Sequence, residues 1–142
     1  MPNLLVLNGP NLNLLGVREP EIYGHDTLED CINEVRKVAA EYGWDVEAFQ
    51  SNHEGELIDT IQAARGRYDA IIINPGAFTH YSYAIADALA MFDGYKVELH
   101  LTNTGAREEF RRTSVISPVV HGTIAGFGRI GYGLAAQAVV LR

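Results

Sequence analysis

The chain has 142 residues, a length typical of one domain. Apolar residues make up 47% of it and charged residues 20%, which excludes a disordered, collagen-like or coiled-coil chain. The formal net charge is -7. An acidic surface repels phosphate backbones, so the charge argues against nucleic acid as the main partner.

Cysteine content and the lengths of the apolar runs indicate the cellular compartment of the protein. The chain has one cysteine, Cys31, which cannot form an internal disulfide, so a secreted, disulfide-stabilised fold is not indicated. No apolar stretch approaches the about 20 residues of a membrane span. The amino terminus lacks the basic start and cleavage site of a signal peptide. We therefore expect a soluble, cytoplasmic protein with no membrane partner.

Short apolar runs alternate with helical periodicity along the whole chain. The first half predicts a strand at Leu4–Leu7, a helix over 27–42, a strand at Asp45–Gln50, a helix around 57–64 and a strand at Ala70–Ile73. The second half predicts a helix near Tyr83–Phe92, a strand at Lys96–Leu101, a short charged helix near Arg107–Arg112, a strand near Val119–Ile124 and a helix from Ile130 onward. Thr27 with Asp30 forms a capping-box pattern, and Gly43 ends that helix.

This alternation predicts an α/β fold with a parallel sheet and helices on both faces, joined by right-handed crossovers. Five strands in one domain, residues 1–142, suit a flavodoxin-like three-layer sandwich with strand order 2-1-3-4-5. Strands 1, 3 and 4 are then neighbours, and ligands bind beyond their carboxyl ends. The densest polar residues follow those ends: Asn8, Asn11 and Asn13, then Asn74, Thr79 and His80, then His100, Thr102 and Asn103.

Several motifs have a structural reading beside a functional one. Residues 126–131 match the dinucleotide pattern G-x-G-x-x-G, but too little chain follows for the second βα unit, so we read these glycines as helix–sheet packing positions. Glu98 and His100 share one face of a strand and could bind a metal together with His80 or His121. Orientation of the histidine by the carboxylate is an equally good role.

Two protein classes that share this topology do not fit the sequence. A phospho-accepting receiver domain needs an aspartate at the end of strand 3, where this chain has Asn74. A flavodoxin needs a hydroxyl-rich phosphate loop after strand 1, and residues 9–16 contain no serine or threonine. FMN is therefore not expected.

Arginines gather near the predicted crevice. Arg107 and Arg111 are four residues apart in a segment that would otherwise be a solvated helix face, and in so acidic a chain they suggest an anionic or polyhydroxylated ligand. The polar segment between Gly16 and Gly24 is either a surface excursion or a lid. As a lid it would bring Arg18 and Tyr23 over the crevice, where a cation beside a phenol makes tyrosine a usable base.

Five sequence blocks resemble type II 3-dehydroquinate dehydratases. They begin at residues 8, 18, 50, 74 and 107 and read NGPNLNLLG, REPEIYG, QSNHEGELID, NPGAFTH and REEFR. The similarity runs over essentially the whole chain in the right order. It implies a metal-free and cofactor-free trans-dehydration of 3-dehydroquinate to 3-dehydroshikimate, for aromatic amino-acid biosynthesis or quinate breakdown. It also implies a homododecamer assembled from trimers.

The resemblance assigns roles to individual residues. It implies that Tyr23 is the base, with Arg18 holding it as phenolate, and that Asn11 stabilises the enolate. It implies that His100 is the acid, oriented by Glu98. The remaining contacts to substrate are implied for the backbone amides of Leu101 and Thr102, for Asn74, His80 and Arg111, and for Asp87 of a neighbouring subunit.

Three positions depart from the family pattern, and none removes a catalytic group. Thr102 stands where serine is common, Tyr81 where threonine is frequent, and Ala86 where an arginine often precedes the motif aspartate. An alternative mechanism for the same dehydration passes through a Schiff base and needs a lysine. The chain has only two lysines, Lys37 on the first helix and Lys96 at the start of strand 4. The start of strand 4 lies opposite to the site, so geometry excludes an imine mechanism.

Two other functions remain as alternatives at this point. The first is a non-catalytic small-molecule binding module of the same fold, which would not need Tyr23, Arg18 and His100 together. The second is an FMN electron-transfer protein, which would be yellow when purified.

Overall fold

In a computed structural model that describes residues 1–142, five parallel strands form one twisted sheet. The strands are β1 (Asn3–Asn8), β2 (Asp45–Gln50), β3 (Ala70–Asn74), β4 (Tyr95–His100) and β5 (Gly122–Ala125). Their spatial order is β2-β1-β3-β4-β5, which confirms the predicted flavodoxin-like order. The strands β1 and β3 lie in the middle and are buried on both faces, as their continuous apolar runs predict.

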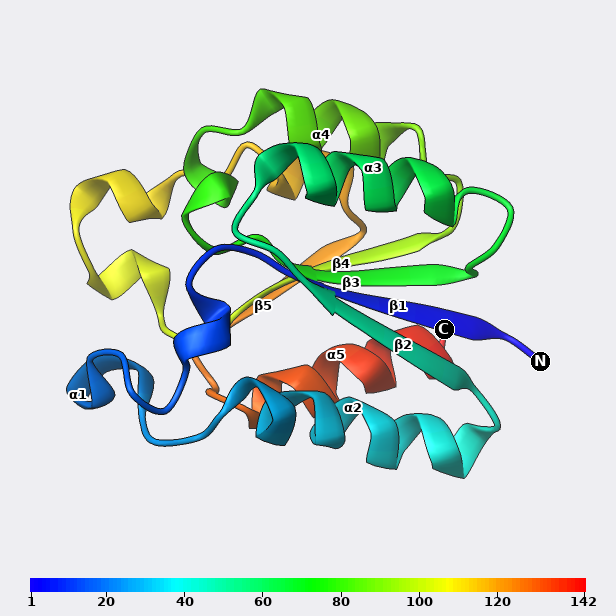
Figure 1. The fold of residues 1–142 in the computed structure, drawn as a ribbon, viewed down its shortest axis with the longest axis horizontal. Coiled ribbons are helices and arrows are strands. Elements are labelled where there is room, and N and C mark those ends of the chain that lie inside the picture. The colour runs from blue at the N-terminus through cyan, green and yellow to red at the C-terminus, as the bar shows by residue number, and fades with distance from the viewer.

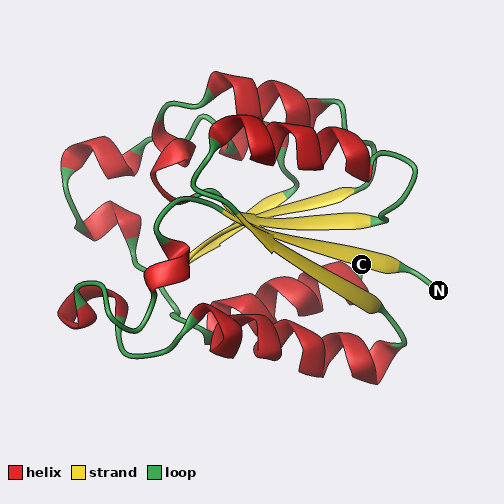
Figure 2. Ribbon diagram, viewed as in Figure 1, coloured by secondary structure: helices red, strands yellow, loops and turns green.

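Helices cover both faces of the sheet (Figures 1 and 2). On one side lie α2 (Leu28–Tyr42) and α5 (Ile130–Val140), and on the other α3 (Glu54–Ala64) and α4 (Tyr83–Ala90). Each pair closes its own apolar core, of 15 buried residues on the α2–α5 side and 13 on the other. No helix has the length and hydrophobicity needed to span a bilayer.

Helix α2 begins and ends as its sequence predicts. The Thr27 hydroxyl accepts a hydrogen bond from the backbone N–H of Asp30 at 3.1 Å, and the Asp30 carboxylate accepts one from the Thr27 N–H at 2.9 Å. Gly43 then takes a left-handed conformation, with φ 73°, and ends the helix.

Two predicted elements differ from the structure. The charged helix expected at Arg107–Arg112 is only a 3₁₀ turn over Glu109–Arg112, preceded by extended backbone at Arg107. A six-residue helix gains too few hydrogen bonds to offset its nucleation cost. The fifth strand was expected from Val119 but begins at Gly122, because Ser117–Val119 forms a 3₁₀ turn with proline at its start.

The glycines of the G-x-G-x-x-G stretch shape the turn between β5 and α5. Gly126 and Gly128 have φ values of 99° and 58°, which favour glycine. A Cβ on Gly131 would lie 3.2 Å from a methyl group of Leu99, so α5 packs closely on β4 at this point. The predicted helix–sheet packing is therefore found at Gly131, whereas Gly126 and Gly128 allow the left-handed backbone of the turn.

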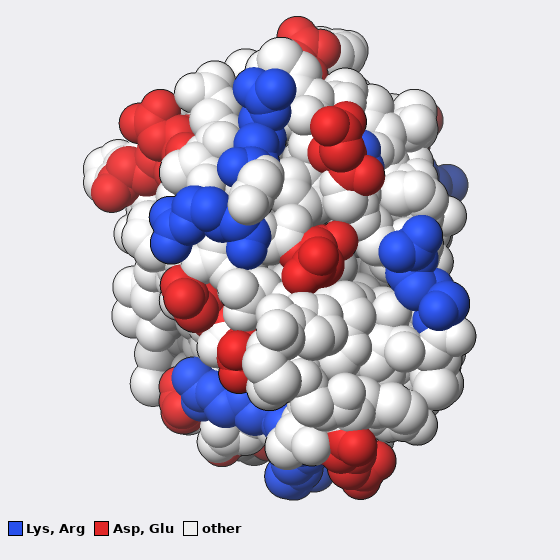
Figure 3. Space-filling model, turned by 90° about the vertical axis from the view of Figure 1, so that its right-hand side faces the viewer, with Lys and Arg blue, Asp and Glu red and all other residues white.

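The two ends of the sheet differ in character. The amino ends of the strands face the viewer in Figure 3, where acidic and basic side chains are intermixed over the surface. Beyond the carboxyl ends lie the irregular segments, including the four-residue helix α1 (Pro20–Tyr23) at the far left of Figure 1. Those segments form the site.

Candidate active site

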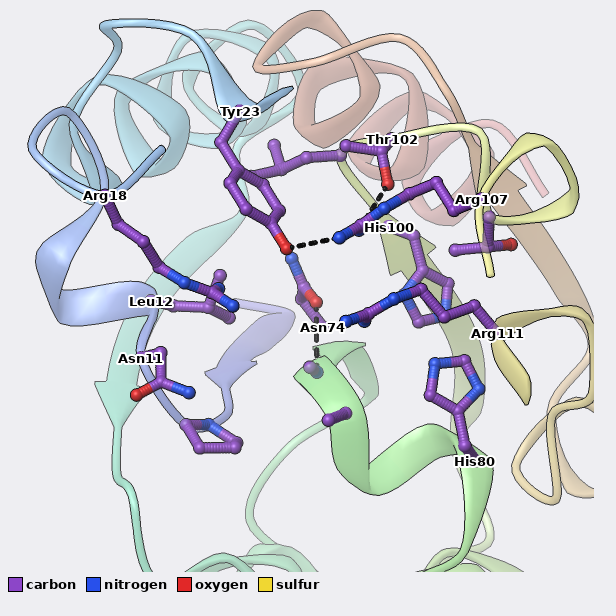
Figure 4. A pocket seen from close by; sticks show the side chains of 15 residues that line it. Asn11, Leu12, Arg18, Tyr23, Asn74, His80, His100, Thr102, Arg107 and Arg111 are labelled. Carbon is purple, nitrogen blue, oxygen red and sulfur yellow. Dashed lines mark hydrogen bonds between the residues drawn. The ribbon is translucent and has the colours of Figure 1, made fainter. Parts of the chain in front are cut away.

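A cleft that is open to solvent lies beyond the carboxyl ends of β1, β3 and β4 (Figure 4). This is the crevice that the strand order predicts. All the predicted site residues except Glu98 and Asp87 line it: Asn11, Arg18, Tyr23, Asn74, His80, His100, Leu101, Thr102 and Arg111. Arg107, noted in the sequence as a cation near the crevice, lines it as well.

Glu98 lies directly behind His100 and fixes its orientation. The Nε2 atom of His100 is 2.6 Å from Oε2 of Glu98, and both residues are on β4, two positions apart. Glu98 is fully buried and His100 is 8% exposed. The hydrogen bond occupies Nε2, so Nδ1 is the ring nitrogen left for a ligand.

The Glu98 carboxylate is surrounded by three hydroxyl donors, of which the sequence analysis had named only Thr79 among the polar residues near the crevice. Thr79 donates to it at 2.6 Å, Ser117 at 2.7 Å and Ser114 at 2.9 Å. Burial opposes ionisation, but the hydrogen bonds from His100 and from the hydroxyl groups outweigh it and lower the pKa of Glu98 to about 2. The carboxylate is therefore ionised at neutral pH, and Nε2 of His100 donates the proton in their hydrogen bond.

Tyr23 is held over the cleft by two arginines that contact it differently. Arg107 donates a hydrogen bond from Nη2 to the Tyr23 hydroxyl at 2.9 Å, and its Nη1 donates to Thr102 at 3.2 Å. Arg18 instead stacks on the ring, with its Cζ atom 4.6 Å from the centroid. The guanidinium that hydrogen-bonds the phenol oxygen is thus that of Arg107, and Arg18, which the resemblance pairs with Tyr23, contacts the ring.

His80 and Arg111 line the side of the cleft below Arg107 in Figure 4. The His80 Nδ1 atom lies 2.8 Å from the Thr113 carbonyl oxygen, so Nδ1 carries the proton and Nε2 is free to accept. Phe110 packs edge-on against the His80 ring, with centroids 5.5 Å apart. Arg111 supplies donors only, so the pair offers both hydrogen-bonding polarities to a hydroxylated ligand.

The turn that carries Asn11 is shaped by close packing and by strained backbone. Asn11 has φ 70°, uncommon for a residue other than glycine, and its N–H donates to the Asn52 side chain at 2.9 Å. A Cβ on Gly9 would lie 2.4 Å from the Pro75 carbonyl oxygen, so only glycine allows the turns after β1 and β3 to meet.

Two charged residues lie away from the cleft. Asp87 is exposed on α4 and does not line the cleft of its own chain. Lys96 is buried near the start of β4, where its Nζ donates to the Leu89 carbonyl at 2.8 Å. Neither Lys96 nor Lys37, which lies on α2, lines the cleft, so neither is placed to form an imine there. No group of three metal-ligating side chains is present, so the suggested metal set of Glu98 and His100 with a second histidine does not assemble.

The fold and the site together define an α/β enzyme that performs acid–base chemistry on a small, hydroxylated anion. A phenol beside a cation, an imidazole paired with a carboxylate, and a cluster of arginines meet in one cleft. Comparison with known proteins assigns the family. The model of the family described as Dehydroquinase class II matches residues 2–140, and the chain belongs to that family.

Individual relatives agree over nearly the whole chain. The 3-dehydroquinate dehydratase of Halalkalibacterium halodurans is 53% identical over 99% of this chain and 97% of its own. The catabolic 3-dehydroquinase of Penicillium rubens is 53% identical over 96% of this chain and 88% of its own. The crystal structure of type II dehydroquinase from Butyrivibrio crossotus has a TM-score of 0.93 and 48% identity, with 97% of each chain covered.

Proposed function

We propose that the chain catalyses the trans-dehydration of 3-dehydroquinate to 3-dehydroshikimate through an enolate intermediate. The observation that carries the proposal is the convergence of Tyr23 and of the His100–Glu98 pair on one cleft, in a chain of the dehydroquinase class II family. The reaction is a β-elimination beside a ketone, which needs a base, an acid and enolate stabilisation but no electron carrier. Both biosynthetic and catabolic use are compatible with the relatives.

Tyr23 is the base in this proposal. Its phenolate removes a proton from the carbon next to the ketone, and the electron pair moves onto the carbonyl oxygen to form the enolate. The hydrogen bond from Arg107 and the stacked guanidinium of Arg18 both favour the phenolate over the neutral phenol. Asn11, which also lines the cleft, stabilises the enolate through its side-chain amide.

His100 is the acid. Because the Nε2–H of His100 is engaged in the hydrogen bond to Glu98, the proton delivered to the departing hydroxyl is the one on Nδ1. The active form of His100 is therefore the imidazolium. The enolate electron pair then expels the hydroxyl group, which leaves as water. The carboxylate behind the ring stabilises the imidazolium before transfer, and it still accepts the hydrogen bond from the Nε2–H of the neutral imidazole afterwards.

The remaining cleft residues bind and orient the substrate. Backbone amides at Leu101 and Thr102 receive the substrate carboxylate, at the point where the chain leaves β4. Asn74, His80 and Arg111 bind the ring hydroxyls, since together they present donors and acceptors to the same region of the cleft.

One experiment tests the proposed reaction. The protein is incubated with 3-dehydroquinate in the presence of a chelator, and the conjugated enone product is followed by its ultraviolet absorbance. We expect turnover by the native chain and almost none by Tyr23→Phe, which removes only the phenol oxygen. No product from a folded native chain contradicts the proposed reaction and favours a binding module. Equal rates for the two proteins would instead overturn the role of Tyr23 as the base.

We further propose that the chain works as a cytoplasmic homododecamer in which Asp87 reaches the cleft of a neighbouring subunit. Its exposed position on α4, outside its own cleft, supports this arrangement. Co-expressed Asp87→Ala and Tyr23→Phe chains should then regain activity that neither has alone, because some clefts combine the intact Tyr23 of one chain with the intact Asp87 of another. A fully active monomer on size-exclusion chromatography contradicts this assembly.

A further inference from the structure

Three buried polar side chains form a hydrogen-bonded row beneath the cleft and take no part in the acid–base steps. They are Asn8 at the end of β1, Asn74 at the end of β3 and Tyr132 on α5, with exposures of 0%, 3% and 0%. The Tyr132 hydroxyl donates to Oδ1 of Asn8 at 2.8 Å and accepts from Nδ2 of Asn74 at 3.1 Å. Burying a hydroxyl is unfavourable unless such partners are present.

Main-chain groups fix the polarity of the row at both ends. At one end, Nδ2 of Asn8 donates to the Phe49 carbonyl oxygen at 3.3 Å, so its Oδ1 must face Tyr132. At the other end, the Gly76 N–H donates to Oδ1 of Asn74 at 3.2 Å, so its Nδ2 must face Tyr132. Reversing either amide would place two donors or two acceptors against each other.

The Tyr132 hydroxyl links the side-chain amides of Asn8 and Asn74, because it donates to the first and accepts from the second. The hydroxyl has one hydrogen, which it donates to the Asn8 oxygen. The Tyr132 oxygen can therefore only accept a hydrogen bond from Asn74, so the Asn74 nitrogen must face it. Burial raises the pKa of Tyr132 well above its ordinary value, so the hydroxyl keeps this proton at neutral pH. The row therefore has a single hydrogen-bonding pattern.

We infer that Tyr132 is a positioning residue that, together with the Gly76 N–H, holds the side-chain amide of Asn74 in the orientation that it presents to the ligand. The inference rests on the proposed role of Asn74 in binding a ring hydroxyl. An amide nitrogen has two hydrogens and an amide oxygen two acceptor sites, and the row uses one of each. Asn74 thus keeps one donor and one acceptor at fixed places, in a cleft where Arg111 offers donors only and His80 offers an acceptor at Nε2.

The test compares Tyr132→Phe with Asn74→Ala, the double variant and a control. Val139→Ala serves as the control, because Val139 is fully buried on the same helix and in the same core but is not in the row. Measured quantities are kcat and KM for 3-dehydroquinate and the unfolding midpoint of each variant. We expect Tyr132→Phe to raise KM about tenfold with a smaller change in kcat, as for the loss of a ligand contact common to ground and transition states. In Asn74→Ala, which should raise KM on its own, adding Tyr132→Phe should raise it little further, because both act on one contact.

Each other outcome is decisive. An unchanged KM in Tyr132→Phe beside a raised KM in Asn74→Ala overturns the positioning role alone. Fully additive effects, or an equal rise of KM in Val139→Ala at the same loss of stability, reduce Tyr132 to a core residue. An unchanged KM in Asn74→Ala removes Asn74 from substrate binding and overturns the inference together with its premise. Should Tyr132→Phe fail to fold, Asn8→Ala removes the acceptor at the other end of the row, and the same rise of KM is required of it.

Discussion

Replacing Glu98 by glutamine removes the charge behind His100 and should weaken the fold in a pH-dependent way. The pKa of Glu98 is lowered from an ordinary value of 4.5 to about 2, a preference for the ionised form of about 3 kcal/mol in the folded state. Because the folded pKa is the lower one, this stability is fully present well above pH 4.5 and is lost as the pH falls toward 2. At pH 3 only about 1 kcal/mol of it remains.

Urea denaturation of the native chain and of Glu98→Gln at pH 7 and pH 3 measures this directly. The two proteins should differ by about 3 kcal/mol at pH 7, and the difference should shrink at pH 3. Glu29→Gln is a matched control, since Glu29 is an exposed carboxylate in a surface ion pair and should change stability by less than about 1 kcal/mol. Equal stability of Glu98→Gln and the native chain at pH 7, or a difference that does not depend on pH, would refute the reasoning.

Three further predictions concern the cleft. His100→Ala should lower kcat by about 10²–10⁴, the usual contribution of an acid–base group, and near-normal turnover would move that role to another side chain. Arg107→Gln should lower kcat/KM for 3-dehydroquinate more than Arg18→Gln does, because only Arg107 hydrogen-bonds the Tyr23 oxygen, and equal losses would contradict this difference. Gly9→Ala should lower the free energy of unfolding by about 1–3 kcal/mol in urea denaturation, since the added Cβ meets backbone that cannot move aside.

The fold could be predicted because its signals are local. The apolar runs of β1 and β3, and the capping box and terminal glycine of α2, are each contained within one element. The errors fall where local signals conflict. Near Val119 a β-branched pair follows Pro118, and the turn that proline favours delays the strand to Gly122. Near Arg107 the charge spacing resembles a helix face, but the segment is too short to form one.

The site was predictable in its residues and less so in its contacts. Strand order alone brings three chain segments to one crevice, so most lining residues could be named in advance. The hydrogen bond from Arg107 to Tyr23 joins residues 84 positions apart, and that between Asn74 and Tyr132 spans 58. No periodicity or local motif encodes such pairings. The hydroxyl groups around Glu98 come partly from an irregular segment, where sequence patterns give little guidance.

The concentration of arginine in the cleft has a consequence for how a ligand arrives. The molecule carries a formal charge of -7, yet the lining of the cleft includes Arg18, Arg107 and Arg111 and no acidic side chain. At low ionic strength an approaching anion meets the repulsion of the whole acidic surface before it meets the arginines. At physiological salt the screening length is about 8 Å, so the repulsion from distant carboxylates is largely screened. The arginines of the cleft then dominate the last steps of approach. Added salt therefore acts in opposite directions at two distances, easing the encounter while weakening the final capture.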